Sequence, residues 1–228
     1  LEKALLDAHI PYRIYGGVRF YDRAEIKDAL SYLRLLAPKS EDDPKELFKN
    51  LAVKRVINSP KRGIGAKTLE LIETQAGHDQ TNMYDVLKHY EIGKGKARAS
   101  IQEFVRVIEE CRALVDTISI DQLMERIMEE SGYLAMLDEE KEIERKENIK
   151  ELINDIADYV ESNPDGSLQD YLQEISLYTD KEQTQQGDFV QLMTIHAAKG
   201  LEFDNVFVYS LCEGIFPNEK SVGEGGQE

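Results

Sequence analysis

The chain has 228 residues, 41% of them hydrophobic, and a formal net charge of −16 at pH 7. The length and apolar content suffice for one large domain or two small ones with buried cores, whereas the charge argues against a protein that coats nucleic acid indiscriminately, because phosphate would repel it. The apolar runs are far shorter than the roughly 18 residues that span a bilayer, and no signal segment opens the chain, so we expect a cytoplasmic protein with no membrane partner.

Both ends of the sequence have the character of cut ends. Leu1 opens an amphipathic helical pattern, LEKALLDAHI, in what reads as its middle. The last residues, SVGEGGQE, are glycine-rich and acidic and offer no packing face. We therefore interpret the chain as part of a larger protein.

The opening of the chain indicates a strand followed by a helix. PYRIYGG, residues 11–17, combines β-favouring residues with paired glycines, which predicts a short strand and a turn. AEIKDALSYLRLLA, residues 24–37, repeats apolar residues at helical spacing, and Pro38 ends that helix. The polar run at 38–44 is the first predicted boundary.

The middle of the chain, from Lys45 to about Asp180, shows only helical periodicity interrupted by turns. The predicted helices cover residues 45–57, 66–76, 83–90, 95–116, 120–130, 133–161 with a break, and 167–178. The polar, unpatterned run at 180–188 is the second predicted boundary.

Strand character returns after this second boundary. FVQLMTIH (189–196) and NVFVYSL (205–211) are near-continuous apolar runs, typical of strands buried in a parallel sheet. The segment between them is short for a parallel crossover, so their direct pairing stays open. We predict a mostly α fold with a small α/β part, in which a parallel sheet formed by 1–37 and 188–228 is interrupted by an all-helical insertion at 38–187.

TIHAAKGLEF, residues 194–203, includes the loop that directly follows the first of these strands. This loop would lie at the carboxyl end of a parallel strand, where open α/β sheets bind ligands. A plain strand-to-helix turn, with Gly200 present for its backbone geometry, is the alternative.

The two cysteines and two of the histidines, His78 and His89, carry no recognisable chemistry. Cys111 and Cys212 are far apart and lack zinc-type spacing, so we expect two reduced thiols and no metal site.

A basic, glycine-rich stretch lies between two predicted helices. The residues from Ala52 to Leu69 include five cations and no acid, and NSPKRGIGAKTLELIE, residues 58–73, turns tightly before a helix. Backbone amides at such a helix start bind anions, which suits a clamp on duplex phosphate that reads no bases. The candidate DNA contacts are Lys61, Arg62, Gly63, Ile64, Gly65, Lys67 and Thr68. An ordinary helix-helix turn is the alternative.

A second stretch, IGKGKARASIQEF at residues 92–104, repeats this pattern of spaced glycines, cations and a following helix. We interpret it as another helix-hairpin-helix-like element, with Lys94, Lys96 and Arg98 facing phosphate. A solvated turn is the alternative.

Several segments resemble those of one protein family. Residues 194–203 closely resemble the fifth conserved motif of superfamily 1 DNA helicases of the UvrD/Rep/PcrA type, and residues 212–221 resemble the stretch that follows it. Residues 16–36 resemble the segment that leads into the accessory subdomain of that family. The resemblance covers essentially all 228 residues in the right order.

The resemblance implies part of a second RecA-like subdomain, split by an accessory helical subdomain, from an ATP-driven 3'-to-5' DNA helicase of repair or replication. It implies that Gly200 lies near the γ-phosphate of ATP and that Glu202 meets the ribose. Thr194 and His196 would lie toward the single strand, and residues 58–73 would contact the duplex. The full-length parent would use ATP and Mg²⁺, and neither is expected to be bound here.

The sequence contains no G-x-x-x-x-G-K-[ST] loop, and the resemblance puts the arginine fingers outside it. We therefore expect no complete catalytic site and no ATP hydrolysis by the chain alone. The expected partners are a single-strand/duplex DNA junction, the first RecA-like subdomain of the parent and repair proteins.

The helical block also allows a different interpretation, as a protein-interaction or autoinhibitory module of a repair helicase. The stretch 121–158, which is crowded with Asp and Glu, supports it. A nuclease-helicase subunit of the same family is a third possibility.

Overall fold

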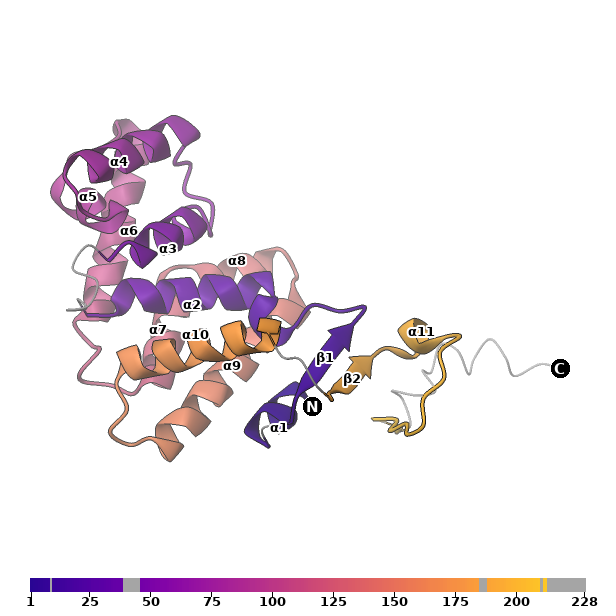
Figure 1. Ribbon diagram of the computed structural model, residues 1–228. Helices are drawn as coiled ribbons and strands as arrows, with labels where there is room; N and C mark the ends of the chain where they lie inside the picture. The colour runs from indigo at the N-terminus through magenta and orange to yellow at the C-terminus, as the bar shows by residue number, and fades with distance from the viewer. Residues whose placement is uncertain (9, 39–45, 185–187, 210, 213–228) are drawn as a thin grey trace. The chain divides into compact units, whose positions relative to one another are not determined.

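The structure is a computed structural model, and it describes all residues except 9, 39–45, 185–187, 210 and 213–228 (Figure 1). The chain divides into two compact units. One combines Leu1–Pro11 with Val18–Phe189, and the other combines Tyr12–Gly17 with Val190–Glu228. Residues 39–44 of the first predicted boundary, the glycine-rich tail and most of the 212–221 segment lie outside the described residues.

The smaller unit contains a parallel two-stranded sheet. Strand β1 (Tyr12–Tyr15) pairs with β2 (Val190–Met193), in a register that joins Tyr12 to Val190 and Tyr15 to Met193. The short helix α11 (Ile195–Ala198) follows β2. The prediction that segments from the two ends of the chain meet in one parallel sheet is confirmed, and so is the mostly α fold class.

The predicted strand at 205–211 is wrong for the residues that the structure describes there. Residues 205–209 form no strand and are all exposed, and Phe207 is 97% exposed. A strand is stable only when its backbone N–H and C=O groups pair with a neighbour. The described sheet ends at two strands, so the apolar run has no partner in it.

The larger unit is helical, as the sequence predicts. Its elements are α1 (Glu2–Asp7), the 3-10 helix η1 (Phe20–Asp22), α2 (Ala24–Leu36), α3 (Phe48–Val56), α4 (Ala66–His78), α5 (Met83–His89), α6 (Gly95–Arg112), α7 (Ile120–Glu130), α8 (Tyr133–Glu139), α9 (Ile143–Ser162) and α10 (Leu168–Thr184). The break predicted within 133–161 is the gap between α8 and α9.

Helix α2 is the centre of this unit, and it contacts α3, α6, α7 and α9 (Figure 1). Its fully buried residues are Ile26, Ala29, Tyr32, Leu33, Leu35 and Leu36. Burying an Ile or Leu side chain contributes about 1.5–3 kcal/mol, so the apolar stripe of α2 organises the core. The functional domain boundaries at 37 and 188 stay a prediction.

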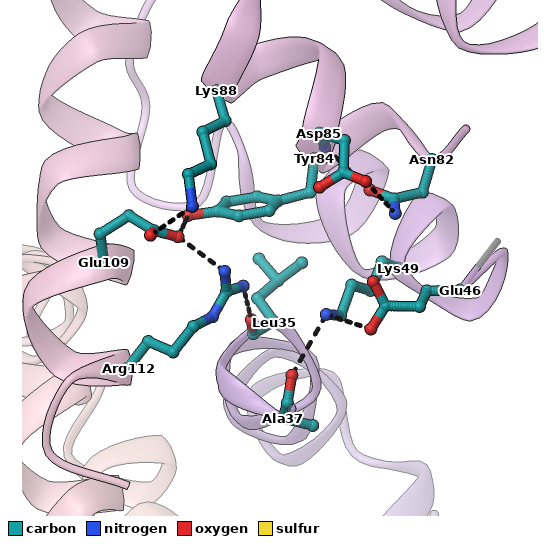
Figure 2. Close-up of polar contacts among 10 residues, drawn as sticks. All are labelled: Leu35, Ala37, Glu46, Lys49, Asn82, Tyr84, Asp85, Lys88, Glu109 and Arg112. Atoms are coloured by element: carbon teal, nitrogen blue, oxygen red, sulfur yellow. Dashed lines mark hydrogen bonds and ion pairs between the residues drawn. The ribbon is translucent and has the colours of Figure 1, made fainter. Parts of the chain in front are cut away.

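Two cations, the buried Lys49 and the partly buried Arg112, hold the carboxyl end of α2 (Figure 2). Lys49 Nζ donates to the carbonyl of Ala37 at 3.1 Å, and Arg112 donates to the carbonyl of Leu35. Lys49 also forms a 2.6 Å ion pair with Glu46, and both side chains are almost fully buried. Positive charge at this end complements the helix dipole and satisfies the last carbonyls.

Glu109 continues this network from α6 (Figure 2). Its carboxylate accepts hydrogen bonds from Tyr84 at 2.8 Å, Lys88 at 2.7 Å and Arg112 at 2.6 Å. Burial alone would raise the pKa of Glu109, but these three donors together lower it. The network therefore ties α5 and α6 to the end of α2.

Candidate nucleic-acid interface

The connection between α3 and α4, residues 57–65, is a closed loop. The side chain of Asn58 bridges it, because Nδ2 donates to the carbonyl of Ile64 at 2.7 Å and Oδ1 accepts from the Ile64 amide at 3.1 Å. The Ile64 side chain is buried. The stretch in which the sequence predicts a glycine hairpin is thus a compact loop with an apolar anchor at Ile64.

The opposite side of this loop faces open space. Gly63 has φ +70°, a left-handed conformation that favours glycine, and a Cβ atom at Gly63 or Gly65 would meet no atom within 4 Å. Gly65 is the N-cap of α4, and no side chain caps that end. The amide of Thr68 bonds the carbonyl of Gly65 at 3.0 Å. The start of α4 therefore presents uncapped backbone to solvent.

The five cations of the acid-free stretch have different surroundings. Lys54 Nζ lies 2.6 Å from Glu73 Oε1, and Arg55 Nε lies 2.6 Å from Asp28 Oδ1. These two charges are already neutralised within the unit.

Lys61 and Lys67 are exposed and form no ion pair within the described part of the chain. They flank the outer side of the loop and the start of α4. Of the predicted cations in this stretch, these two are available to meet an external anion.

Arg62 points into the protein. Its Nη1 donates to the carbonyls of Val56 at 2.9 Å, Ile57 at 3.2 Å and Pro60 at 3.2 Å. Its Nη2 donates to Tyr32 Oη and to the carbonyl of Ser131, both at 3.0 Å. No pattern in the sequence marks Tyr32 or Ser131 as a support of this loop, since neither lies near it in the chain.

The second predicted hairpin precedes α6. Gly93 has φ +84° and Gly95 has φ +55°, and no side chain caps the helix at Lys94. Lys94 and Lys96 are exposed, whereas Arg98 forms an ion pair with Glu91. This site offers two exposed lysines, and its arginine charge is used internally.

In the smaller unit, the candidate residues follow β2 in sequence. Thr194 Oγ1 accepts from the amide of Ala197 at 3.1 Å and thus caps α11. His196, Gly200 and Glu202 are exposed, and Gly200 has φ +85°, where an added Cβ would have no atom within 4 Å. A side chain at Gly200 would be strained, while open space surrounds its backbone.

Gly16 is a residue of this site that sequence reasoning about function missed. It lies just after β1 with φ +78°, and a Cβ there would be 3.3 Å from the Cβ of Ala197. The turn after β1 therefore packs closely on α11. The paired glycines of PYRIYGG were the available signal.

Metal chemistry and membrane insertion have no support in the described ranges. Over those ranges, no group of three or more His, Cys, Asp or Glu side chains is placed to hold a metal ion. No helix within them is long and apolar enough to cross a membrane.

The chain thus combines a small parallel sheet, whose two strands come from opposite ends of the sequence, with a helical unit that contains a glycine-rich basic loop. The chain matches the family model described as UvrD-like helicase C-terminal domain over residues 1–228. The chain belongs to this family, which confirms the resemblance to UvrD/PcrA-type helicases.

Individual relatives agree with this assignment. The chain is 37% identical to DNA helicase II of Salmonella typhimurium over 237 residues, which cover 100% of the chain and 32% of the relative. It is 36% identical to the ATP-dependent DNA helicase PcrA of Staphylococcus epidermidis, over 97% of the chain and 30% of the relative. For PcrA of Bacillus subtilis the identity is 37%, over 98% and 31%. The chain thus spans about a third of the length of these curated relatives.

Proposed function

We propose that the chain is the accessory helical subdomain, with part of the second RecA-like subdomain, of an ATP-dependent 3'-to-5' DNA helicase. Its role is to hold duplex DNA beside a single-strand junction while the motor part acts on the single strand. Family membership and the helicase names of the relatives support this proposal. The observation that carries the DNA contact is the outer side of the 57–65 loop.

The proposed contact is made to the DNA backbone. Lys61 and Lys67 supply exposed charge, and the first amides of α4, those of Ala66 and Lys67, supply donors at a helix start. Such groups position a duplex without reading its bases. Because the chain as a whole carries −16, the contact stays local and is sensitive to salt.

The second hairpin is proposed to contact the same duplex through Lys94 and Lys96. Both are exposed beside an uncapped helix start. The ion pair with Glu91 weakens the case for Arg98 as a phosphate contact. Two backbone contacts on one helical unit would orient the duplex as well as hold it.

The loop after β2 is proposed to supply one wall of the ATP site in the full-length protein. Gly200 leaves room for a phosphate to approach the backbone, and Glu202 presents an exposed carboxylate for ribose hydroxyls. Thr194 and His196 would face the single strand. ATP with Mg²⁺ would supply the free energy of translocation when bound between this wall and the first RecA-like subdomain.

We propose that the chain alone does not hydrolyse ATP, since its sequence has no phosphate-binding loop to hold the nucleotide. Its partners would be junction DNA, the first RecA-like subdomain and repair proteins. Turnover of ATP by the purified 228-residue chain would contradict this part.

The DNA contact is tested by fluorescence anisotropy with a labelled single-strand/duplex junction over a series of salt concentrations. Lys61→Ala with Lys67→Ala should weaken binding and flatten its salt dependence. Lys54→Ala is the matched control, because that lysine is paired with Glu73. Unchanged binding by the double variant would remove the hairpin from the proposal.

A second candidate function is protein interaction by the acidic face. Ile143, at the start of α9, is 72% exposed and has the exposed acids Glu139, Glu140 and Glu144 near it in the chain. An exposed apolar side chain among acids would suit a basic partner or an inhibitory contact on the motor. Reversing these three charges should then abolish capture of repair proteins and leave DNA binding intact, and the opposite result would favour the DNA role.

A further inference from the structure

The guanidinium of Arg62 has almost no capacity left for an external ligand. Its two terminal nitrogens carry four N–H groups, and they face five acceptors within hydrogen-bond distance. Only the Nε–H remains. A phosphate could bind the fork only if several of these bonds broke.

All five acceptors are uncharged: four are backbone carbonyls and one is the Tyr32 hydroxyl. Three of the carbonyls belong to residues 56–60, at the end of α3 and in the loop itself. A cation there satisfies the last carbonyls of the helix and complements its dipole. The charge of Arg62 is thus used to fold the loop back onto α3.

The remaining contacts fix this fork to three other helices. Tyr32 lies on α2, Ser131 lies at the end of α7, and the Arg62 guanidinium lies 5.1 Å from the centre of the Phe104 ring on α6. Tyr32 also donates to the carbonyl of Ser59 at 2.6 Å. Burial raises the pKa of Tyr32, so the hydroxyl keeps the proton for this bond.

The next residue along the chain is Gly63, which is exposed and has a left-handed backbone with open space where a Cβ would lie. Lys61 on the other side of Arg62 is exposed. Arg62 therefore points inward between two exposed neighbours, Lys61 and Gly63. Where Arg62 is held, the directions of Lys61 and of the Gly63 backbone are set.

We propose that Arg62 is a positioning residue, which holds the 57–65 loop in the conformation that presents Lys61, Lys67 and the start of α4 to duplex phosphate, and that it does not touch phosphate itself. This inference rests on the proposed DNA contact and assigns Arg62 a different role from its neighbour Lys61. Lysine cannot replace it, because a single ammonium cannot bridge acceptors on both sides of a planar fork.

Two measurements on the 228-residue chain test the inference. Hydrogen exchange of the amides of residues 57–65 reports the loop, and junction-DNA anisotropy at several salt concentrations reports affinity and the number of phosphate contacts. The variants are Arg62→Lys, Arg62→Ala, Tyr32→Phe and Lys61→Ala. Tyr84→Phe is the matched control, since this buried tyrosine bonds Glu109 and not the loop.

Arg62→Lys loses the hydrogen bonds of the fork, so we expect faster hydrogen exchange confined to the loop. Binding should be roughly tenfold weaker, because the loop must then be ordered on binding. The salt slope should be unchanged, because the charge is kept. Tyr32→Phe should show the same pattern more weakly, which keeps the test open if Arg62→Lys folds poorly. Lys61→Ala should flatten the slope and leave loop exchange unchanged. Tyr84→Phe should change neither.

Arg62→Lys with wild-type affinity and wild-type loop exchange would overturn the inference. So would Arg62→Ala with a salt slope flattened as in Lys61→Ala and unchanged loop exchange, because that pattern marks a direct phosphate contact. If the wild-type chain does not bind junction DNA, the proposed function fails, and the exchange data still decide whether Arg62 sets the loop.

Discussion

The buried ion pair between Lys49 and Glu46 gives a quantitative test of how the centre of the helical unit is held. The side chains are 3% and 1% exposed, their charged atoms lie 2.6 Å apart, and Lys49 also bonds the carbonyl of Ala37. Lys49→Met keeps a long unbranched side chain and removes its charge. It leaves a buried carboxylate and a helix-terminal carbonyl without a donor, and breaking such a pair costs about 3–5 kcal/mol.

The exposed pair of Lys54 and Glu73 is the control for this substitution. It has the same chemistry and the same 2.6 Å separation, but its side chains are 42% and 59% exposed. Lys54→Met should therefore cost about 0.2–1 kcal/mol. Adding Glu46→Gln to Lys49→Met removes the unpaired charge and should recover about 1–3 kcal/mol.

Urea unfolding followed by circular dichroism measures the free energies of unfolding of the wild type and the three variants. The buried-pair argument would be refuted if Lys49→Met cost no more than Lys54→Met. It would be refuted equally if the double variant were less stable than Lys49→Met alone.

Three further predictions concern stability. The pKa of Glu109 lies below its ordinary value of 4.5, so the stabilisation from its three donors is complete above pH 4.5 and is lost as the pH falls through the folded-state pKa. The free energy of unfolding, measured from about pH 6 to 2, should therefore depend less on pH in Glu109→Gln than in the wild type. An unaltered pH profile would contradict this role of Glu109. Gly63→Ala forces alanine into φ +70° and should lower the free energy of unfolding by about 1–2 kcal/mol. Gly77→Ala, within α4 with open space around it, is the control and should raise the free energy of unfolding by about 0.5–1 kcal/mol. Thermal unfolding of both variants measures these changes. Tyr21→Phe removes a 2.5 Å hydrogen bond to Asp155 that links η1 to α9, and it should lower the free energy of unfolding by about 1 kcal/mol. No measurable decrease would show that this hydrogen bond does not stabilise the fold.

The helices could be predicted from the sequence because each carries its own apolar stripe. The predicted ranges 66–76 and 120–130 agree with α4 and α7 to within two residues at each end. Local periodicity is sufficient where a helix satisfies its own backbone.

The strands show the opposite behaviour, because a strand depends on a partner that can lie anywhere in the chain. FVQLMTIH contains β2, which finds β1 more than 170 positions earlier. NVFVYSL has an equally apolar pattern, yet residues 205–209 form no strand. Composition identified both runs as strand-like and could not tell which of them would be paired.

The candidate site shows the same limit at the level of single side chains. Lys61 and Arg62 are adjacent cations in an acid-free stretch, and the sequence assigns both to phosphate. The structure separates them, since one is exposed and the other donates to five internal acceptors. The deciding partners, Tyr32 and Ser131, come from helices distant in the chain.

This separation changes the salt dependence expected for the loop. Each phosphate neutralised contributes about −0.9 to the slope of log K against log salt. Five contacting cations from Ala52 to Leu69 would give about −4.5, whereas the two exposed lysines, Lys61 and Lys67, give about −1.8. A double alanine variant at these two positions that lost about 1.8 of slope would match the structure. If replacing Arg55, which is paired with Asp28, lowered the salt slope much further, DNA would have to bind a charge that forms an internal ion pair in the chain without DNA.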